Sequence, residues 1–241
     1  MEVPVHPLVH WLGAAGMAIG AAVIGGVTLK SRREDVSHGV LHLFVCLIGL
    51  FAYVSFIFDR TAVHVDGRSF YVSHFVSWIL TFPMIGVAIA MVGLPPLQNV
   101  VERRLRASIM GGVAGTLILW PGAALFQAFA RTDGERWAWF GLSLAAGVAT
   151  IWQLWRPVLH QVEIKGGKSV RDYRLLAALF TAAAIAYEVV WLVGEPGLVL
   201  ISPQLELTLL LVLDLASDAG LGILSVVLVE RLVHEFEPEP G

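Results

Sequence analysis

Two aspartates, Asp214 and Asp218, stand four residues apart near the middle of the last apolar stretch of the chain. On a helix, residues with this spacing share one face, with Cβ atoms about 5–6 Å apart. Between Leu207 and Val229 the sequence has no other charged side chain. A charge at the centre of a membrane helix costs about 2.5–3.5 kcal/mol on insertion scales, so both carboxyl groups should face a polar interior. The pair therefore indicates a site.

A third acid, Glu188, lies in the preceding apolar stretch, within the segment Y-E-V-V-W-L-V-G. The third apolar stretch adds a polar stripe, because His74, Ser77, Trp78 and Thr81 recur at steps of three and four residues. Hydroxyls bonded back to their own helix are the simpler interpretation of this stripe. A histidine well inside a span is instead a functional candidate. The sequence offers no lysine or arginine beside the three acids.

Two histidine pairs, His6 with His10 and His38 with His42, have a four-residue spacing that could bind a metal. Both pairs lie near the ends of apolar stretches, where interfacial histidines are the simpler interpretation. One histidine flanked by acids, as at His74, is a poor fingerprint for a metal or haem site. We therefore predict no metal site and no catalytic residues, and we do not expect an enzyme.

The composition assigns the chain to the membrane proteins. Of its 241 residues, 57% are hydrophobic and 15% are charged, and the mean hydropathy is +0.76. These values are far too apolar for a soluble domain and predict a lipid bilayer as the environment. The net charge of −3, without a basic patch, gives no reason to expect nucleic acid. The single cysteine, Cys46, excludes an internal disulfide.

Seven apolar stretches are long enough to cross the roughly 30 Å of hydrocarbon in a bilayer. They are predicted at 8–29, 37–58, 70–93, 106–129, 137–159, 173–194 and 203–230. Residues 1–234 should form one all-α domain of seven transmembrane helices, and the acidic tail 235–241 should be disordered. Of the 16 lysines and arginines, 12 follow the odd-numbered stretches. This asymmetry predicts an external N-terminus and a cytoplasmic C-terminus.

Several segments, taken together, resemble the microbial rhodopsin family, the seven-helix opsins typified by bacteriorhodopsin. The resemblance runs in the same order over nearly the whole chain and has no gap within the segments. The segments are S-W-I-L-T-F-P in the third stretch, I-M-x-G in the fourth, R-W-A-W-F-G-L-S-L-A-A in the fifth, Y-E-V-V-W-L-V-G in the sixth, and E-L-T-L-L-L-V-L-D-L-A-S-D-A-G-L-G in the seventh. The resemblance implies the seven-helix bundle of that family in the cell membrane of a microbe.

The resemblance also implies an altered chemistry. Members of the family attach retinal through a Schiff base to a lysine of the seventh helix, and that lysine falls on Asp218. The family's primary proton acceptor falls on Ser77, its cytoplasmic proton donor on Ala88 and its buried arginine on His74. A proton pump needs groups that take and give protons in sequence. We therefore expect no covalent retinal and no light-driven proton pumping.

The positions that surround retinal in the family predict a ligand pocket here. Three of them depart from the family pattern: Phe82 replaces a threonine, Ala184 a tryptophan and Glu188 a proline. The loss of the large indole should open volume, and Glu188 should converge with the two aspartates. The predicted pocket residues are Trp78, Phe82, Met110, Phe140, Ser143, Ala184, Tyr187, Glu188, Trp191, Asp214 and Asp218. A polar network of His74, Ser77 and Glu206 is predicted beside them.

Three functional hypotheses remain open at this stage. In the first, the cavity binds a small or amphipathic ligand noncovalently, and the protein is a sensor or receptor. A cationic ligand would balance the acids, and free retinal or a preformed retinal–amine Schiff base also belongs to this class. In the second, the chain is a regulatory or assembly partner of other opsins, or a homo-oligomer such as a dimer or trimer. In the third, the acids relay protons or cations across the membrane.

Overall fold

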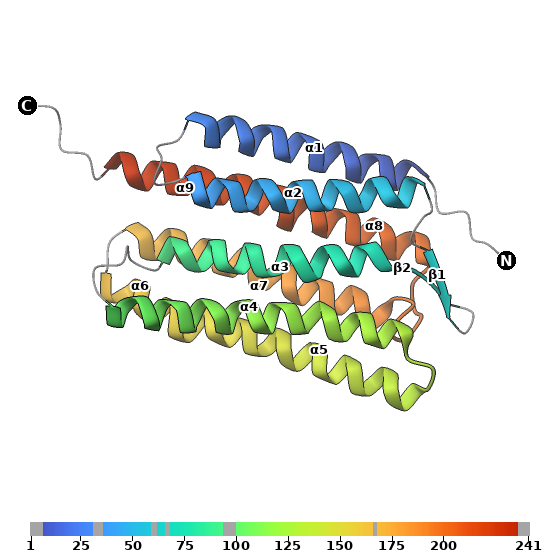
Figure 1. Cartoon of the computed structure of the whole chain (residues 1–241). Coiled ribbons are helices and arrows are strands. Elements are labelled where there is room, and N and C mark those ends of the chain that lie inside the picture. Colours follow the sequence, from blue (N-terminus) through green and yellow to red (C-terminus); the bar gives the residue numbers. More distant parts are fainter. Residues whose placement is uncertain are drawn as a thin grey trace, which may run out of the picture.

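The computed structural model describes residues 7–30, 36–58, 62–65, 68–93, 100–165 and 168–235. In these ranges it is a bundle of long helices with one short hairpin (Figure 1). The elements are α1 (Pro7–Lys30), α2 (Val36–Ile57), β1 (Ala62–Val65), β2 (Arg68–Tyr71), α3 (Val72–Gly93), α4 (Val100–Phe129), α5 (Asp133–Gln153), η1 (Leu154–Val158), α6 (Leu159–Lys165), α7 (Lys168–Val193), α8 (Pro203–Asp214), η2 (Leu215–Gly220) and α9 (Leu221–Glu235). His6 and residues 236–241 of the predicted tail lie outside the described residues.

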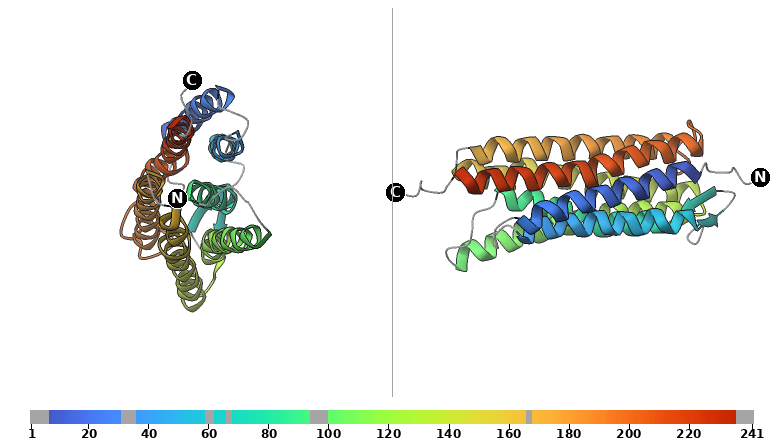
Figure 2. Two further views of the ribbon diagram at one scale, coloured as in Figure 1. Left: turned by 90° about the vertical axis from the view of Figure 1, so that its left-hand side faces the viewer. Right: turned by 90° about the horizontal axis from the view of Figure 1, so that it is seen from above.

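Seven of the described helical segments are long and apolar enough to cross a membrane. Two of these segments combine several elements, because α5, η1 and α6 follow one another without a break, as do α8, η2 and α9. Seen along its axis, the bundle has α1, α2 and α9 on one side and α4 and α5 on the opposite side, with α3 and α7 between them (Figure 2). The predicted all-α seven-helix bundle is thus confirmed.

Several helices run beyond the predicted spans. For example, α4 begins at Val100 rather than at residue 106, and α7 begins at Lys168 rather than at residue 173. The added turns contain arginine, glutamate and lysine, which are good helix formers. Hydropathy marks the thickness of the hydrocarbon, whereas the helix continues into the polar interface. Span prediction therefore shortens these helices.

The start of α5 has a separate cause. The segment T-D-G-E forms a capping box in which the Thr132 hydroxyl accepts from the Glu135 amide at 3.2 Å. In return, a Glu135 carboxylate oxygen accepts from the Thr132 amide at 3.3 Å. This reciprocal pair satisfies two backbone donors at the helix start. It places the first residue of α5 at Asp133, four residues before the predicted start at 137.

A two-stranded antiparallel hairpin, which the sequence analysis did not anticipate, precedes α3. Ala62 pairs with Tyr71, and Val65 pairs with Arg68. The sequence between the strands is Asp-Gly, the dipeptide most typical of two-residue hairpin turns. Phe70 and Tyr71, predicted as the first residues of the third span, therefore belong to β2. We call this end of the bundle the hairpin end, and the end where α9 finishes the opposite end.

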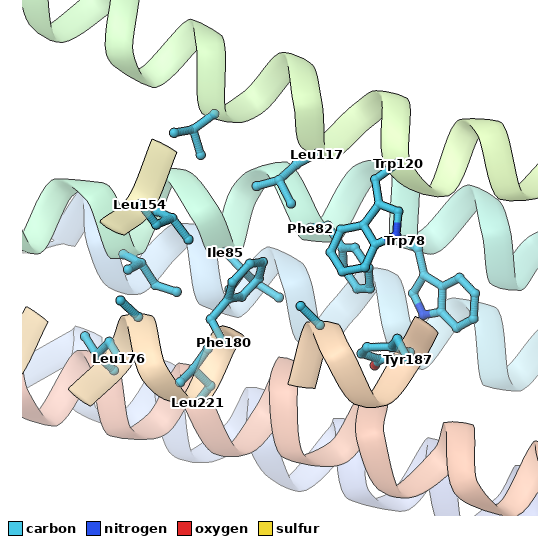
Figure 3. Packing of buried hydrophobic residues seen from close by; sticks show 14 of the residues in the cluster. Trp78, Phe82, Ile85, Leu117, Trp120, Leu154, Leu176, Phe180, Tyr187 and Leu221 are labelled. Carbon is cyan, nitrogen blue, oxygen red and sulfur yellow. The ribbon is translucent and has the colours of Figure 1, made fainter. Parts of the chain in front are cut away.

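The packed core lies mainly between α3, α4, α5 and α7. In Figure 3 the aromatic rings of Trp78, Phe82, Trp120 and Tyr187 gather in one region, and aliphatic side chains such as Leu154 fill the other. Beside this core, α1 packs closely on η2 because α1 carries glycines where the two meet. A Cβ atom on Gly20 would lie 2.7 Å from the Cβ of Ala219. This close approach holds in place the segment that contains Asp218.

Candidate functional site

The Asp214 carboxyl group is the centre of the first polar cluster, and only 2% of the residue is exposed. Its Oδ2 accepts from the Tyr53 hydroxyl at 2.7 Å and lies 2.8 Å from Nε2 of His74. Its Oδ1 accepts from Nε1 of Trp78 at 2.9 Å and from the Tyr187 hydroxyl at 2.7 Å. An ionised carboxylate has about four acceptor sites. Four side chains therefore satisfy it completely.

The helices around Asp214 place these donors by simple periodicity. His74 and Trp78 are four residues apart on α3, so both point at the last span. Tyr53 comes from α2 and Tyr187 from α7. When His74 is protonated, its contact with Asp214 is also an ion pair. The cluster thus joins four helices through one carboxyl group.

Asp218 connects to the same cluster through two hydroxyl groups. The Ser217 hydroxyl donates to Oδ1 of Asp218 at 3.2 Å and lies 3.1 Å from the Tyr187 hydroxyl. The Cys46 thiol points at the backbone carbonyl of Asp218 at 3.8 Å. Side chains therefore form a continuous path from Asp214 through Tyr187 and Ser217 to Asp218.

The backbone at this point is a π-helix. Leu221 donates its amide to the carbonyl of Ala216, five residues earlier, at the end of η2. Such π turns are rare and occur frequently at functional sites. Asp214 directly precedes this π-helix and Asp218 lies within it, and both residues are buried. The inward orientation expected for them is what the structure shows.

Glu188 lies apart from the aspartates, in a second site. Its Oε1 accepts from Nε1 of Trp120 on α4 and from the Ser143 hydroxyl on α5, the latter at 3.4 Å. The expected convergence of all three acids is therefore wrong. Consecutive helical residues are about 100° apart, so when Tyr187 faces Asp214, Glu188 must face α4 and α5.

The second oxygen of Glu188 has no such partner. Its Oε2 is buried and accepts no hydrogen bond from the residues that the structure describes. It borders a pocket that is partly open to the outside and has a cavity volume of about 20 Å³, which is enough for about one water molecule. The lining residues are Trp78, Phe82, Trp120, Pro121, Ala124, Ser143, Tyr187, Glu188 and Trp191.

Aromatic rings dominate the lining of this pocket. Figure 3 shows the rings of Trp78, Phe82, Trp120 and Tyr187 close to one another. The ring centroid of Phe82 lies 5.4 Å from that of Trp120 and 5.3 Å from that of Tyr187. Trp78 stacks on Phe82 with centroids 6.0 Å apart. Trp191 completes the wall, and its Nε1 donates to the Gln127 side chain at 2.6 Å. The pocket is thus an aromatic box with one carboxylate oxygen free to accept.

Some predicted site residues lie outside this pocket. Met110 and Phe140 are partly buried and pack against the core cluster, and Ala184 is buried within it. None of the three belongs to the pocket lining. The volume expected from Ala184 therefore does not enlarge the described pocket.

The predicted polar network is only partly joined. His74 reaches Asp214, whereas the Ser77 hydroxyl donates to the backbone carbonyl of His74 at 2.8 Å. Glu206 accepts from the Glu195 amide at 2.7 Å near the hairpin end. Ser77 therefore follows the simpler back-bonding interpretation, and Glu206 holds the loop between α7 and α8.

Three site residues escaped the sequence analysis: Tyr53, Trp120 and Gln127. Tyr53 and Gln127 are polar side chains within apolar stretches, and that signal was available in the sequence. Gln127 accepts from Trp191 and donates to the carbonyl of Pro196 at 3.1 Å. No sequence signal marks Trp120, because its bond to Glu188 depends on where α4 and α7 lie in the bundle.

The rings of His38 and His42 lie inside the bundle. His42 is fully buried and His38 is 4% exposed. His38 Nε2 lies 2.8 Å from the Ser225 hydroxyl of α9. Neither ring nitrogen of His42 has a hydrogen-bond partner among the described residues. His38 is the third residue of α2, so the prediction that the pair lies near the end of its span stays a prediction.

The family follows from the whole chain. The model of the family described as bacteriorhodopsin-like protein matches residues 5–232. This chain belongs to the bacteriorhodopsin-like protein family. It is 26% identical over 223 residues to sensory rhodopsin-2 of Natronomonas pharaonis, covering 90% of this chain and 86% of that protein. It is 24% identical over 238 residues to bacteriorhodopsin of Halobacterium salinarum, covering 95% and 86%.

Solved structures of bacteriorhodopsin-like proteins share the fold. The thermophilic rhodopsin from Rubrobacter xylanophilus superposes with a TM-score of 0.85 at 22% identity, covering 92% of this chain and 94% of that one. Halorhodopsin, a light-driven chloride pump, superposes with a TM-score of 0.85 at 18% identity, covering 97% and 98%. The family as a whole implies retinal binding in general, and the relatives of this chain include sensory rhodopsins.

The first prediction concerns the donors around Asp214. Tyr53→Phe and Tyr187→Phe should each lower the free energy of unfolding by about 1.5–3 kcal/mol, because each removes a hydrogen bond to a charged acceptor. Tyr173→Phe is the matched control, since Tyr173 is equally buried and donates to the neutral carbonyl of Leu154 at 2.7 Å. It should cost about 0.5–1.5 kcal/mol. Reversible denaturation in neutral detergent measures all three. Equal losses would show that Asp214 is not an ionic acceptor.

Proposed function

We propose that this chain is a bacteriorhodopsin-like protein that carries no covalent retinal and binds a smaller ligand noncovalently, as a sensor or receptor. Its three lysines are Lys30, Lys165 and Lys168. They are the last residue of α1, the last of α6 and the first of α7. Asp218 occupies the place in the last span where the sequence resemblance puts the family's lysine. The chain therefore does not fit a retinal attached through a Schiff base.

The single observation that carries the proposal is the aromatic box beside Glu188. Ligand sites are mostly apolar and aromatic, with a few polar groups placed to orient the ligand. Here Trp78, Trp120 and Trp191 supply apolar walls, and Oε2 of Glu188 supplies an acceptor with no partner among the described residues. A buried acceptor without a partner is costly. A ligand that donates to it would remove that cost.

The size of the pocket favours a compact ligand over a polyene. The rings of Phe82 and Trp120 are in contact across it, with centroids 5.4 Å apart. The Asp214 carboxylate is already saturated by its four donors. A ligand that needs a polar anchor therefore has Oε2 of Glu188 available, whereas the oxygens of Asp214 are already occupied.

The orientation in the membrane is part of the proposal. Lys30, Lys165 and Lys168 stand at the opposite end of the bundle, whereas Arg131 and Arg136 stand at the hairpin end. Basic residues are in excess at the opposite end, which supports the proposal that this end faces the cytoplasm. The membrane proposed is the cell membrane of a microbe. Assembly as a dimer or trimer, or with other opsins, stays a prediction.

The second prediction tests the absence of a covalent pigment. Purified protein mixed with retinal should show no red-shifted visible band of the protonated Schiff-base type, because no lysine amine lies in the bundle interior. Asp218→Lys would be required for such a band, and Asp218→Asn, which adds no amine, should give none. Absorption spectra before and after borohydride reduction measure this. A reducible band in the unmodified protein would overturn the proposal.

The third prediction tests the pocket itself. Cyclohexylmethanol, a compact neutral probe, should change the tryptophan fluorescence, because three of the eight tryptophans (Trp78, Trp120 and Trp191) line the pocket. Ala124→Phe should abolish the change, since Ala124 also lines it. Ala145→Phe on the exposed face of α5 is the matched control and should bind normally. The proposal fails if the unmodified protein shows no saturable change, or if Ala124→Phe binds as well as the control.

Proton conduction is the second candidate function, and one observation favours it. Asp214, Tyr187, Ser217 and Asp218 form an unbroken series of contacts at hydrogen-bond distance inside the bundle. Each hydroxyl has one proton, so all three contacts are hydrogen bonds when Asp218 is protonated and donates to Ser217. Cys46 contacts the Asp218 backbone, and His42 lies one helical turn from Cys46 on the same face of α2. These groups would supply the cytoplasmic arm of a relay.

The fourth prediction separates this candidate from the first. A conductor reconstituted in liposomes should carry protons, under a potassium diffusion potential, faster than empty liposomes do. Tyr187→Phe should then reduce the flux severalfold, because it removes the hydroxyl that links Asp214 to Ser217. Tyr173→Phe, outside the path, should leave the flux unchanged. An internal pH-sensitive dye measures the flux. A flux equal to that of empty liposomes would exclude conduction.

A further inference from the structure

Oε2 of Glu188 is the one buried carboxylate oxygen without a hydrogen-bond partner among the described residues. Asp214 accepts from four side chains, and one of them, His74, can carry a positive charge. Glu188 accepts only at Oε1, from Trp120 and Ser143, which are both neutral. Its Oε2 is buried and accepts from nothing among the described residues.

None of the nine residues that line the pocket is basic. A buried carboxylate requires an opposite charge or several hydrogen-bond donors, because burial removes part of its hydration. The described side chains supply neither at Oε2. A water molecule, a proton on the carboxyl group or a ligand can compensate this oxygen, and among ligands one with a positively charged N–H donor supplies both the charge and the hydrogen bond.

The walls of the pocket favour the same chemistry. The faces of Trp, Tyr and Phe rings carry negative electrostatic potential and attract cations within about 6 Å. Trp78, Phe82, Trp120, Tyr187 and Trp191 together give the pocket five such rings. Aromatic cages bind quaternary ammonium groups through such contacts, and an ammonium group that keeps an N–H also donates to a carboxylate. The same rings also offer apolar contact to the body of such a ligand.

The route into the pocket favours a ligand that enters from the bilayer. Glu188 is only half-buried, and its neighbours Ile185 and Val189 are 55% and 52% exposed on the lipid-facing side of α7. Glu188 lies five residues before Val193, the last residue of α7. At 1.5 Å per residue this is about 8 Å from the helix end. Amphipathic molecules rest at a similar depth in the interface.

From these observations we propose that the pocket binds a primary or secondary organic ammonium ion. This proposal rests on the ligand-binding function proposed above. The ammonium group donates a hydrogen bond to Oε2 of Glu188 and lies among the aromatic rings. The apolar body of the ligand lies against Trp120, Pro121 and Ala124, and the rings that line the pocket move apart to admit it. A negatively charged ligand of the same shape would be repelled by Glu188.

The fifth prediction compares three probes with one ring and different charges. Cyclohexylmethylamine, cyclohexylmethanol and cyclohexanecarboxylate are titrated against the full chain in neutral detergent at pH 7, with tryptophan fluorescence as the readout. The amine should bind about tenfold or more tightly than the alcohol, because a charge-assisted hydrogen bond is stronger than a neutral one. The carboxylate should bind more weakly than both.

A matched pair of variants assigns the preference to one side chain. Glu188→Gln keeps the size of the side chain and an acceptor for Trp120 and Ser143, and removes the charge. It should reduce the amine preference over the alcohol to about onefold. Glu163→Gln removes the same charge at the surface, from an ion pair with Arg174, and should leave the preference intact.

The outcomes separate the two proposals. If the amine and the alcohol bind the unmodified protein equally well, the ammonium proposal is wrong and the ligand-binding function stands. If neither probe binds, the ligand-binding function itself is wrong. The comparison of probes on the unmodified chain needs no variant, so the proposal remains testable even if Glu188→Gln does not fold. An amine preference that survives in Glu188→Gln would also overturn it.

Discussion

The structure depends on one requirement, that a carboxyl group buried inside a membrane bundle be satisfied by its own neighbours. Asp214 meets this requirement with hydrogen bonds from Tyr53, His74, Trp78 and Tyr187. Removing one partner of a buried charge leaves that charge uncompensated, which is strongly unfavourable. The donors come from α2, α3 and α7, so this one group fixes three helices against the last span. The position of the aromatic box follows from that arrangement, since Trp78 and Tyr187 belong to both.

Glu188, which follows Tyr187 in α7, is the opposite of Asp214, because its carboxyl group is not fully satisfied by its neighbours. Its Oε1 is held by Trp120 and Ser143, and its Oε2 has no donor among the described residues. A polar group left incomplete in a well-packed protein calls for a physical explanation. A bound ligand provides one, because it would supply the donor and the charge together. The two acids therefore divide the roles: Asp214 stabilises the bundle, and Glu188 is available for recognition.

The substitutions in the pocket fit this division. Phe82 fills the box and contacts the rings of Trp78, Trp120 and Tyr187. Ala184 is buried in the core without widening the pocket. Together they leave a compact space with one acid at its edge. Such a space suits a small ligand better than an extended polyene.

The sequence by itself determined the membrane environment, the seven spans and the family resemblance, because hydropathy and motif spacing are properties of single segments. It also indicated that Asp214 and Asp218 face the interior, since lipid would not tolerate them. Tertiary structure decided which donors reach each acid. The bond between Trp120 and Glu188, and the place of Tyr53 beside Asp214, join residues 68 and 161 positions apart. Hydropathy carries no information on how each helix is rotated about its axis. The rotation of α7 points Glu188 at α4 and α5 and away from the aspartates.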